Sequence, residues 1–232
     1  MIALEAVDLA KEYTGGDGGK ITVLDGVNLE VARGQMVAIV GASGAGKSTL
    51  LHLLGALDQP TRGSIRIAGE SIAGRSDDQL SDLRNRSIGF VFQFHHLLRE
   101  FSALENVMMP LRIGGWTEMR ARARAEDLLS RVGLSGRVHH RPAALSGGEQ
   151  QRTAVARALA LDPAVLLADE PSGNLDHGNS ERLHDLFAEL SRDLEIAMVI
   201  ATHNRSLASR ADRTLLLEDG RLTDTDVREV VP

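Results

Sequence analysis

Residues 37–49 read Val-Ala-Ile-Val-Gly-Ala-Ser-Gly-Ala-Gly-Lys-Ser-Thr, and this stretch decides the fold. Its first four residues form a short, entirely apolar run, which is typical of a strand buried on both faces of a parallel sheet. After the glycines, leucines recur with the spacing of one helical stripe, at Leu50, Leu53, Leu54 and Leu57. The sequence therefore predicts a strand, a glycine-rich loop and a helix, which we expect to end at residues 58–60, Asp-Gln-Pro.

The loop between that strand and that helix has the composition of a phosphate-binding loop. Glycine lets backbone N–H groups close around phosphate oxygens, and a helix start adds unpaired donors and a positive dipole end. We expect Lys47 to reach the β- and γ-phosphates and the Ser48 hydroxyl to bind Mg²⁺. The alternative, a glycine-rich turn with an exposed lysine, fits the strand and helix on either side less well. The nucleotide-binding candidates are Gly41, Ala42, Ser43, Gly44, Ala45, Gly46, Lys47, Ser48 and Thr49.

A second apolar run delivers two acids at its end. Residues 164–168 are followed directly by Asp169 and Glu170, and open α/β sheets place their sites at the carboxyl ends of strands. We expect Asp169 to hold Mg²⁺, directly or through water, and Glu170 to orient or deprotonate the attacking water. Glutamate is a weak base at neutral pH, so its position should matter more than its proton affinity. Taken alone, the motif could equally be a solvated acidic turn before Pro171.

Composition sets limits on the class of protein. The chain has 232 residues, of which 43% are hydrophobic and 25% charged, as in ordinary globular proteins. It contains no cysteine, which excludes disulfides, thiolate metal sites and thiol nucleophiles. A formal net charge of −6 does not indicate a nucleic-acid partner. We recognise neither a secretory leader nor an apolar run near the ~20 residues that span a bilayer, so we expect no signal peptide and no membrane span.

The rest of the chain alternates strands with helices. Residues 2–31 read as short strands around a glycine-rich turn at 15–19, and a helix fits at 180–192. Further apolar runs that predict strands lie at 65–67, 165–168, 198–201 and 215–217. This order predicts an α/β fold with a mostly parallel sheet and flanking helices. A mainly helical block at 94–160 interrupts it as an inserted subdomain, and the polar residues 221–232 are expected to fray.

The stretch Leu145-Ser146-Gly147-Gly148-Glu149-Gln150 precedes a predicted helix. Ser146 and Glu149 form a capping box, with which any helix can begin. Two glycines in the first turn cost about 1 kcal/mol each relative to alanine, which suggests a backbone that must approach something. This hexapeptide resembles the signature motif of ABC ATPases. Other motifs agree with that family in order and spacing across nearly the whole chain: Tyr13, Gln93, the residues 173–176 (Gly-Asn-Leu-Asp) and His203.

The resemblance implies one domain over 1–232, with antiparallel N-terminal strands. A nucleotide-binding core would occupy about 1–93 and 161–232, and a helical signature subdomain about 94–160. It implies that two copies pair head to tail, with each ATP between the loop of one copy and the signature residues of the other, Ser146, Gly147, Gly148 and Glu149.

The resemblance also assigns single residues. Tyr13 would stack on adenine, Gln93 would sense Mg²⁺ and the γ-phosphate, His203 would contact the γ-phosphate and Asp176 would act across the dimer interface. Taken singly, each of these residues could be structural. Ser172 and Asn204 stand where relatives often have threonine and aspartate, a mild departure; we assign no chemistry to either group.

Residues 92–110 are unusually apolar for a loop and a helix start. In ABC transporters this region receives membrane permease subunits, although part of it must also be core. The stretch most resembles ATPases that serve lipoprotein release, which implies a peripheral protein on the cytoplasmic face of a bacterial inner membrane. Efflux ATPases of the MacB type and FtsE-like regulators of periplasmic hydrolases are alternatives within the same group.

Functions other than transport are less well supported by the sequence. ABC proteins of translation or DNA repair carry two such domains or a long coiled-coil insertion, and a nucleoside kinase has no need of residues 145–150. The pairs His95-His96 and His139-His140 could suggest a metal site, but neither has a nearby cysteine or the i, i+4 spacing of helical ligands.

Overall fold

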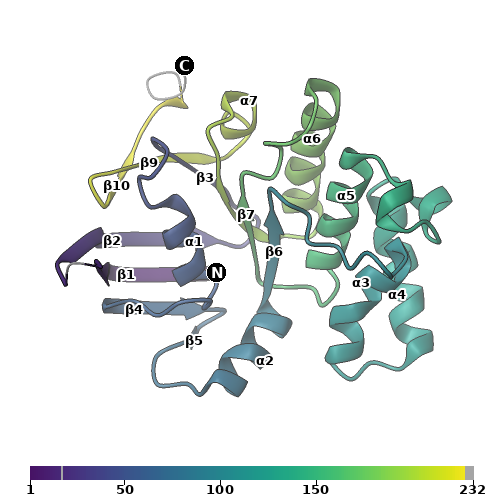
Figure 1. The fold of residues 1–232 in the computed structure, drawn as a ribbon, viewed down its shortest axis with the longest axis horizontal. Coiled ribbons are helices and arrows are strands. Elements are labelled where there is room, and N and C mark those ends of the chain that lie inside the picture. The colour runs from purple at the N-terminus through teal and green to yellow at the C-terminus, as the bar shows by residue number, and fades with distance from the viewer. Residues whose placement is uncertain (17, 228–232) are drawn as a thin grey trace.

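The computed structural model describes residues 1–16 and 18–227, and within them a six-stranded sheet in the order β10-β9-β3-β8-β7-β6 (Figure 1). Its strands are β3 (Met36–Val40), β6 (Ile88–Phe92), β7 (Val165–Asp169), β8 (Ala197–Ala201), β9 (Arg213–Glu218) and β10 (Arg221–Asp224). All neighbouring pairs are parallel except β9 and β10. The expectation that 221–232 fray is wrong for β10, which pairs with β9, while 228–232 lie outside the described residues.

A second, antiparallel sheet has the order β2-β1-β4-β5. It consists of β1 (Ile2–Thr14), β2 (Lys20–Ala32), β4 (Arg62–Ile67) and β5 (Glu70–Ser71). The sequence indicated short strands before residue 32, yet β1 and β2 each run for 13 residues. Register shifts along their pairing explain the difference, because irregularities of this kind bend and twist a long strand without ending it.

The parallel strands are buried on both faces, as their apolar composition predicts. Val37 and Ile39 of β3 pack with the antiparallel sheet and the helix α1 (Lys47–Leu54), whereas Met36 belongs to the apolar cluster on the other face. Successive side chains of β7 and β8 divide between the two clusters in the same way. A strand between two apolar layers has no solvated face, so its sequence shows no polar alternation.

The helix α1 ends earlier than the sequence indicated, at Leu54 rather than at residues 58–60. Gly55 follows it, and a Cβ at this glycine would lie 2.4 Å from two ring atoms of Phe90. Ala56 then adopts a positive φ of 52°, which no helix allows. Leu57, expected on the helical stripe, therefore leaves the helix and is 47% exposed.

The other helices are α2 (Asp77–Ser87), α3 (Ala103–Ile113), α4 (Glu118–Arg131), α5 (Gly147–Ala158), α6 (His177–Asp193) and α7 (Arg205–Ala208). The expected mainly helical block is present as α3, α4 and α5, which lie together on one side of β6 and β7 (Figure 1). Sequence reasoning missed α2, although Ser76 and Gln79 form the capping box that marks its start. Among the described residues, no helix is long and apolar enough to cross a membrane.

The division into a core and a subdomain near residues 94 and 160 stays a prediction. The apolar cluster that fills α3, α4 and α5 continues without a break into β7, β8 and α6. Leu128 on α4, Val155 on α5 and Phe187 on α6 are members of this one cluster, and each is fully buried.

The Gly55→Ala variant tests the close packing at the residue that follows α1. Its added methyl group would overlap the Phe90 ring, which stacks on Phe92 with ring centroids 5.7 Å apart, and would lie 3.1 Å from a methyl group of Leu167, so the ring would have to shift. We expect the free energy of unfolding to fall by about 1–3 kcal/mol, the usual cost of overpacking. Gly136→Ala is the matched control, because nothing lies within 4 Å of a Cβ placed there. Equal stability of the two variants in chemical denaturation would contradict this account.

Candidate functional site

The loop that follows β3 requires glycine at several positions. Gly41, Gly44 and Gly46 have φ values of 153°, 83° and 100°, which residues with a Cβ rarely adopt. A Cβ at Gly41 would lie 2.4 Å from the Leu217 carbonyl oxygen, and one at Gly46 would lie 2.8 Å from a methyl group of Val23. The loop is thus closely packed against β9 and β2, which fixes where its N–H groups lie.

Lys47, the first residue of α1, folds its side chain back over this loop. Its ammonium group donates hydrogen bonds to the carbonyl oxygens of Gly41, at 2.8 Å, and Ala42, at 3.0 Å. An ammonium group has three N–H donors, so one is left without a partner among the described residues. The charge is therefore held at the mouth of the loop, where phosphate oxygens are expected.

Glu170 and His203 come together at the carboxyl edge of the parallel sheet. The pairing of Asp169 with Ala201 brings the ends of β7 and β8 level, and the N–H of Glu170 donates to the Ala201 carbonyl at 2.9 Å. The Glu170 carboxylate accepts the backbone N–H of His203 at 3.1 Å and lies 2.8 Å from its ring Nδ1. It also accepts a hydrogen bond from the Thr202 hydroxyl at 3.3 Å, which the sequence did not single out.

This contact leaves the histidine accessible. The side chain of His203 is 75% exposed, whereas that of Glu170 is 18% exposed. With Nδ1 donating to the carboxylate, the other ring nitrogen, Nε2, has no hydrogen-bond partner in the described part of the chain and can meet a ligand. Glu170 has a positive φ of 45°, uncommon for a residue with a Cβ. Such backbone conformations cluster at functional sites.

Gln93 follows β6 and is held by a residue that the sequence did not assign. Its side-chain Nε2 donates to Asn174 Oδ1 at 2.9 Å, and Asn174 Nδ2 donates to the Gln93 carbonyl at 3.3 Å. Gly173 lies against the same glutamine, since a Cβ placed there would be 3.0 Å from Nε2. Gln93 is thus hydrogen-bonded to the segment that leads to Asp176. The sequence had singled out the motif at 173–176 but not its contact with Gln93.

Ser146 begins α5 with the expected capping box. Its hydroxyl accepts the Glu149 N–H at 3.3 Å, and the Glu149 carboxylate accepts the Ser146 N–H at 2.8 Å. This backbone hydrogen bond, with help from Arg137 at 3.0 Å, holds the pKa of Glu149 below its usual range. The carboxylate therefore stays ionised and continues to cap the helix at neutral pH.

The glycines of this helix start differ in what surrounds them. A Cβ at Gly148 would lie 2.5 Å from Asn179 Oδ1, while one at Gly147 would meet only Leu175, at 3.7 Å. Asn179 also donates to both carboxylate oxygens of Asp176, from its backbone at 2.9 Å and its side chain at 2.6 Å. These bonds hold the pKa of Asp176 below its ordinary value. Asn179 thus connects the signature motif at Gly148 with Asp176 of the motif at 173–176. The sequence analysis assigned no role to Asn179.

Ser172 and Asn204, the two residues that depart from the family pattern, each have a hydrogen-bond partner in the fold. The Ser172 hydroxyl lies 2.9 Å from Nε2 of His184, a fully buried side chain whose burial lowers its pKa. Asn204 caps α7 by accepting the Leu207 N–H at 3.1 Å, as an aspartate could.

The predicted Mg²⁺ ligands suit that ion by chemistry. Ser48 lies in the first turn of α1, and Asp169 ends β7, two strands away from β3 in the sheet. Among the described residues, no group of three or more His, Cys, Asp or Glu side chains could hold a metal by itself. Mg²⁺ does not need such a group, because it usually takes one or two protein oxygens together with phosphates and water. A hydroxyl and a carboxylate therefore fit it.

A phosphate loop, two acids at a strand end and a histidine beside them define a P-loop protein that binds and hydrolyses nucleoside triphosphates. Residues 24–173, more than half of the chain, match the family described as ABC transporter, and the chain belongs to this family. It is an ATP-binding and ATP-hydrolysing subunit of ABC type.

Curated relatives and solved structures agree. The chain is 55% identical over 219 residues to the lipoprotein-releasing system ATP-binding protein LolD of Geobacter metallireducens, covering 94% of this chain and 97% of that protein. It is 54% identical over 220 residues to LolD of Bordetella pertussis, covering 95% of each. It also resembles a dimeric ATP-binding cassette, MJ0796, bound to ADP and Pi, with a TM-score of 0.87, 36% identity and coverage of 97% and 99%. The expected fold class is confirmed.

A Gly148→Ala variant tests the contact between the two interface motifs. We expect the overlap with Asn179 to lower the thermal unfolding midpoint by several degrees, since about 1 kcal/mol corresponds to roughly 2–4 °C in a chain of this size. Adding Asn179→Ala to this variant removes the overlapping atoms and should restore most of the loss. If the double variant is no more stable than Gly148→Ala alone, the contact does not account for the glycine.

Proposed function

We propose that this chain hydrolyses ATP in a site completed by a second copy of itself, and that the cycle drives membrane subunits in lipoprotein release. The observation that carries the proposal is the separation of two halves of one site. The phosphate loop, Glu170 and His203 lie at one edge of the parallel sheet. Ser146 instead begins α5, on the opposite side of β6 and β7 from α1 (Figure 1).

A head-to-tail pair reunites these halves. In it, the start of α5 in one copy faces the phosphate loop of the other, and uncovered N–H groups at a helix start suit the γ-phosphate. Only the closed pair touches each ATP from both sides, so ATP favours closure and hydrolysis removes that preference. The dimeric state of the similar cassette MJ0796, which holds ADP and Pi, supports this arrangement.

Within the site, each residue has a distinct role. The loop N–H groups and Lys47 hold the β- and γ-phosphates, and Glu170 orients the attacking water and accepts its proton. His203, whose Nε2 is free, contacts the γ-phosphate and donates to it when the ring carries both protons. Ser48 and Asp169 would hold Mg²⁺, with Gln93 beside them, and the bound ion would supply positive charge to offset the negative charge that develops on the phosphates.

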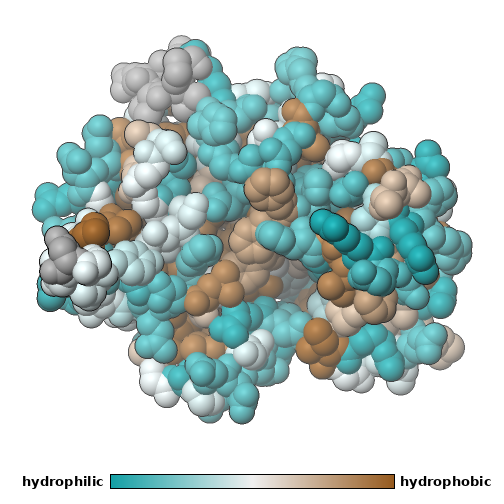
Figure 2. Space-filling model, viewed as in Figure 1, coloured by the Kyte–Doolittle hydropathy of each residue, from teal (hydrophilic) through white to brown (hydrophobic). Residues whose placement is uncertain are grey.

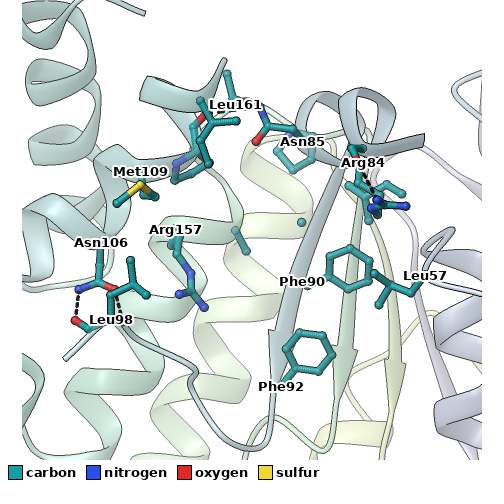
Figure 3. Close-up of a pocket in the computed structure, with 17 residues that line it drawn as sticks. Leu57, Arg84, Asn85, Phe90, Phe92, Leu98, Asn106, Met109, Arg157 and Leu161 are labelled. Atoms are coloured by element: carbon teal, nitrogen blue, oxygen red, sulfur yellow. Dashed lines mark hydrogen bonds between the residues drawn. The ribbon is translucent and has the colours of Figure 1, made fainter. Parts of the chain in front are cut away.

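The proposed surface for the membrane subunits is a groove of about 460 Å³ between α2 and β6 on one side and α3 on the other. Figure 3 shows Phe90 and Phe92 on one wall and Met109, Asn106 and Leu98 on the other. Hydrophobic surface gathers over the middle of this face (Figure 2). An apolar groove between two rigid elements suits a short helix from a partner.

Residues 92–110, which the sequence predicted as the docking region, line two separate hollows. Phe94 is 65% exposed but lines a separate hollow with residues 95–97 and 142–143. One wall of the groove comes instead from α2, which sequence reasoning missed, and Ile113, 70% exposed, extends the groove beyond residue 110. We therefore place docking on the groove itself rather than on the whole stretch.

The signature helix α5 connects this groove to the nucleotide site. Arg157 of α5 lines the groove and donates to the carbonyl oxygens of His95, at 2.9 Å, and His96, at 2.8 Å. Gln151, on the same helix, donates to the Phe92 carbonyl at 3.1 Å. The backbone on both sides of Gln93 is thus fastened to α5. A partner that shifts the groove wall moves Gln93 and the helix that begins at Ser146 together.

The kind of cargo is proposed from the relatives. Both LolD proteins match this chain over nearly its whole length, and their names describe lipoprotein release. We propose LolC- and LolE-like permeases as partners and a peripheral position on the cytoplasmic face of the inner membrane. Purifying the chain from membranes tests this: permeases of that type are expected, and an efflux or cell-division partner would instead assign it to another branch of the group.

A Glu170→Gln variant should bind ATP, lose turnover by at least about a hundredfold and accumulate as a dimer, because the amide cannot accept the proton of the attacking water. Light scattering with ATP measures the dimer, and phosphate release measures turnover. Glu189→Gln, on the exposed surface of α6, is the matched control. A monomeric Glu170→Gln protein at saturating ATP would contradict the two-copy site.

An Ile113→Asp variant should lose association with the membrane subunits by about tenfold while binding ATP normally, since it places a charge in the apolar groove. Co-purification and stimulation of ATP turnover by the permeases measure the effect. Met119→Asp is the matched control, because Met119 is 80% exposed on α4 and does not line the groove. Equal association of both variants would remove the groove from the docking surface.

A further inference from the structure

The predicted adenine-stacking residue is held in place by a small charged network. The Tyr13 hydroxyl donates to Asp58 Oδ2 at 3.1 Å, and the Lys11 ammonium donates to Asp58 Oδ1 at 2.7 Å. The same ammonium donates to the Gln59 carbonyl at 2.8 Å, and the Gln59 N–H donates back to Asp58 Oδ1 at 2.7 Å. The end of β1 is thereby fastened to the turn that follows the phosphate-loop helix.

Lys11 and Tyr13 are two residues apart near the end of β1, and although the pairing with β2 shifts register between them, both side chains reach the same carboxylate, that of Asp58. The ammonium lies 4.9 Å from the centroid of the Tyr13 ring, on one of its faces. The side chain of Lys11 is only 11% exposed, whereas Tyr13 is 40% exposed. One face of the ring is therefore covered by Lys11, which leaves the other for a flat ligand.

The ionisation of Asp58 supports a firm contact. Burial alone would raise the pKa of this carboxyl group, but the hydrogen bonds from Lys11, the Gln59 N–H and Tyr13 bring the pKa below its ordinary value. Asp58 is thus a carboxylate at neutral pH and accepts from the ammonium and the phenol at once. Charge-assisted hydrogen bonds of this kind are roughly twice as strong as neutral ones.

We infer that Asp58 and Lys11 are positioning residues for the nucleotide base: they fix the Tyr13 ring at the angle at which its free face stacks on the base. The inference rests on the proposed ATP site. The Tyr13 ring loses little further conformational entropy when nucleotide binds. Its hydrogen bond to Asp58 and the Lys11 ammonium on its covered face already hold it in place. Binding a base to a preorganised ring loses less entropy than binding it to a mobile one.

The test compares ATP with inorganic tripolyphosphate, which has the phosphates but no base. Both are titrated with Mg²⁺ into the full-length chain by calorimetry. We expect Asp58→Ala to weaken ATP binding roughly fivefold, a change of the size of one typical intramolecular hydrogen bond. Tripolyphosphate binding should stay within about twofold of the wild type. Asp127→Ala is the matched control, because it removes an exposed carboxylate paired with Arg131 on α4.

A second variant separates positioning from a general loss of structure. Tyr13→Phe keeps the ring and the ion pair of Lys11 with Asp58 but removes the tether, and should weaken ATP binding about two- to threefold. The double variant with Asp58→Ala should bind ATP no more than about twofold more weakly than Asp58→Ala alone, because both changes break one bond.

Each outcome decides a different question. Equal weakening of ATP and tripolyphosphate by Asp58→Ala, no weakening of either, or an unaffected Tyr13→Phe overturns the positioning role. Wild-type protein that binds neither ligand overturns the proposed ATP site, and this inference with it.

Discussion

The parallel pairing of β3, β8 and β7 is the constraint on which the site depends. The apolar side chains of these strands are buried on both faces, and a one-residue slip in register would move each of them to the opposite face, where the packing is built for a different set. That register brings the carboxyl ends level. The phosphate loop leaves β3, the two acids leave β7 and His203 follows β8, which is why Glu170 and His203 touch although 33 positions separate them.

Close approach of backbone and side chains limits which residues the nucleotide motifs can contain. A Cβ at Gly41 or Gly46 would collide with β9 or β2, and one at Gly148 would collide with Asn179. Contacts within a single chain therefore explain why glycine stands at Gly41 and Gly46 of the phosphate loop and at Gly148 of the signature motif, without any ligand or second copy. At Gly147, by contrast, a side chain would have room, and the loss of helix stability there is better explained by the proposed contact with the nucleotide of the other copy.

Much of the fold and the candidate site could be predicted from the sequence, because the strongest signals were local. The glycine loop, the two acids and the capping box at Ser146 each depend on a few consecutive residues. What local patterns could not give was set by distant contacts. Gly55, just after α1, has to be small because Phe90 of β6 lies against it, and β10 forms because β9 offers it a partner. The contact of Asn174 with Gln93 and that of Asn179 with Gly148 depend on partners elsewhere in the fold, which the motif at 173–176 did not identify.

The turn after α1 has a consequence for communication through the molecule. Leu57 lines the groove, and the next residue, Asp58, anchors Tyr13 and Lys11. Consecutive Cα atoms are held about 3.8 Å apart, so a displacement of Leu57 would also move Asp58, whose carboxylate accepts the hydrogen bond of the Tyr13 hydroxyl. The proposed docking groove and the proposed base contact thus meet at two neighbouring residues, a connection separate from Gln93 and the signature helix. If both proposed roles hold, a guest in the groove would change how long a nucleotide stays bound, and by the reciprocity of linked equilibria a bound nucleotide would change the affinity for the guest.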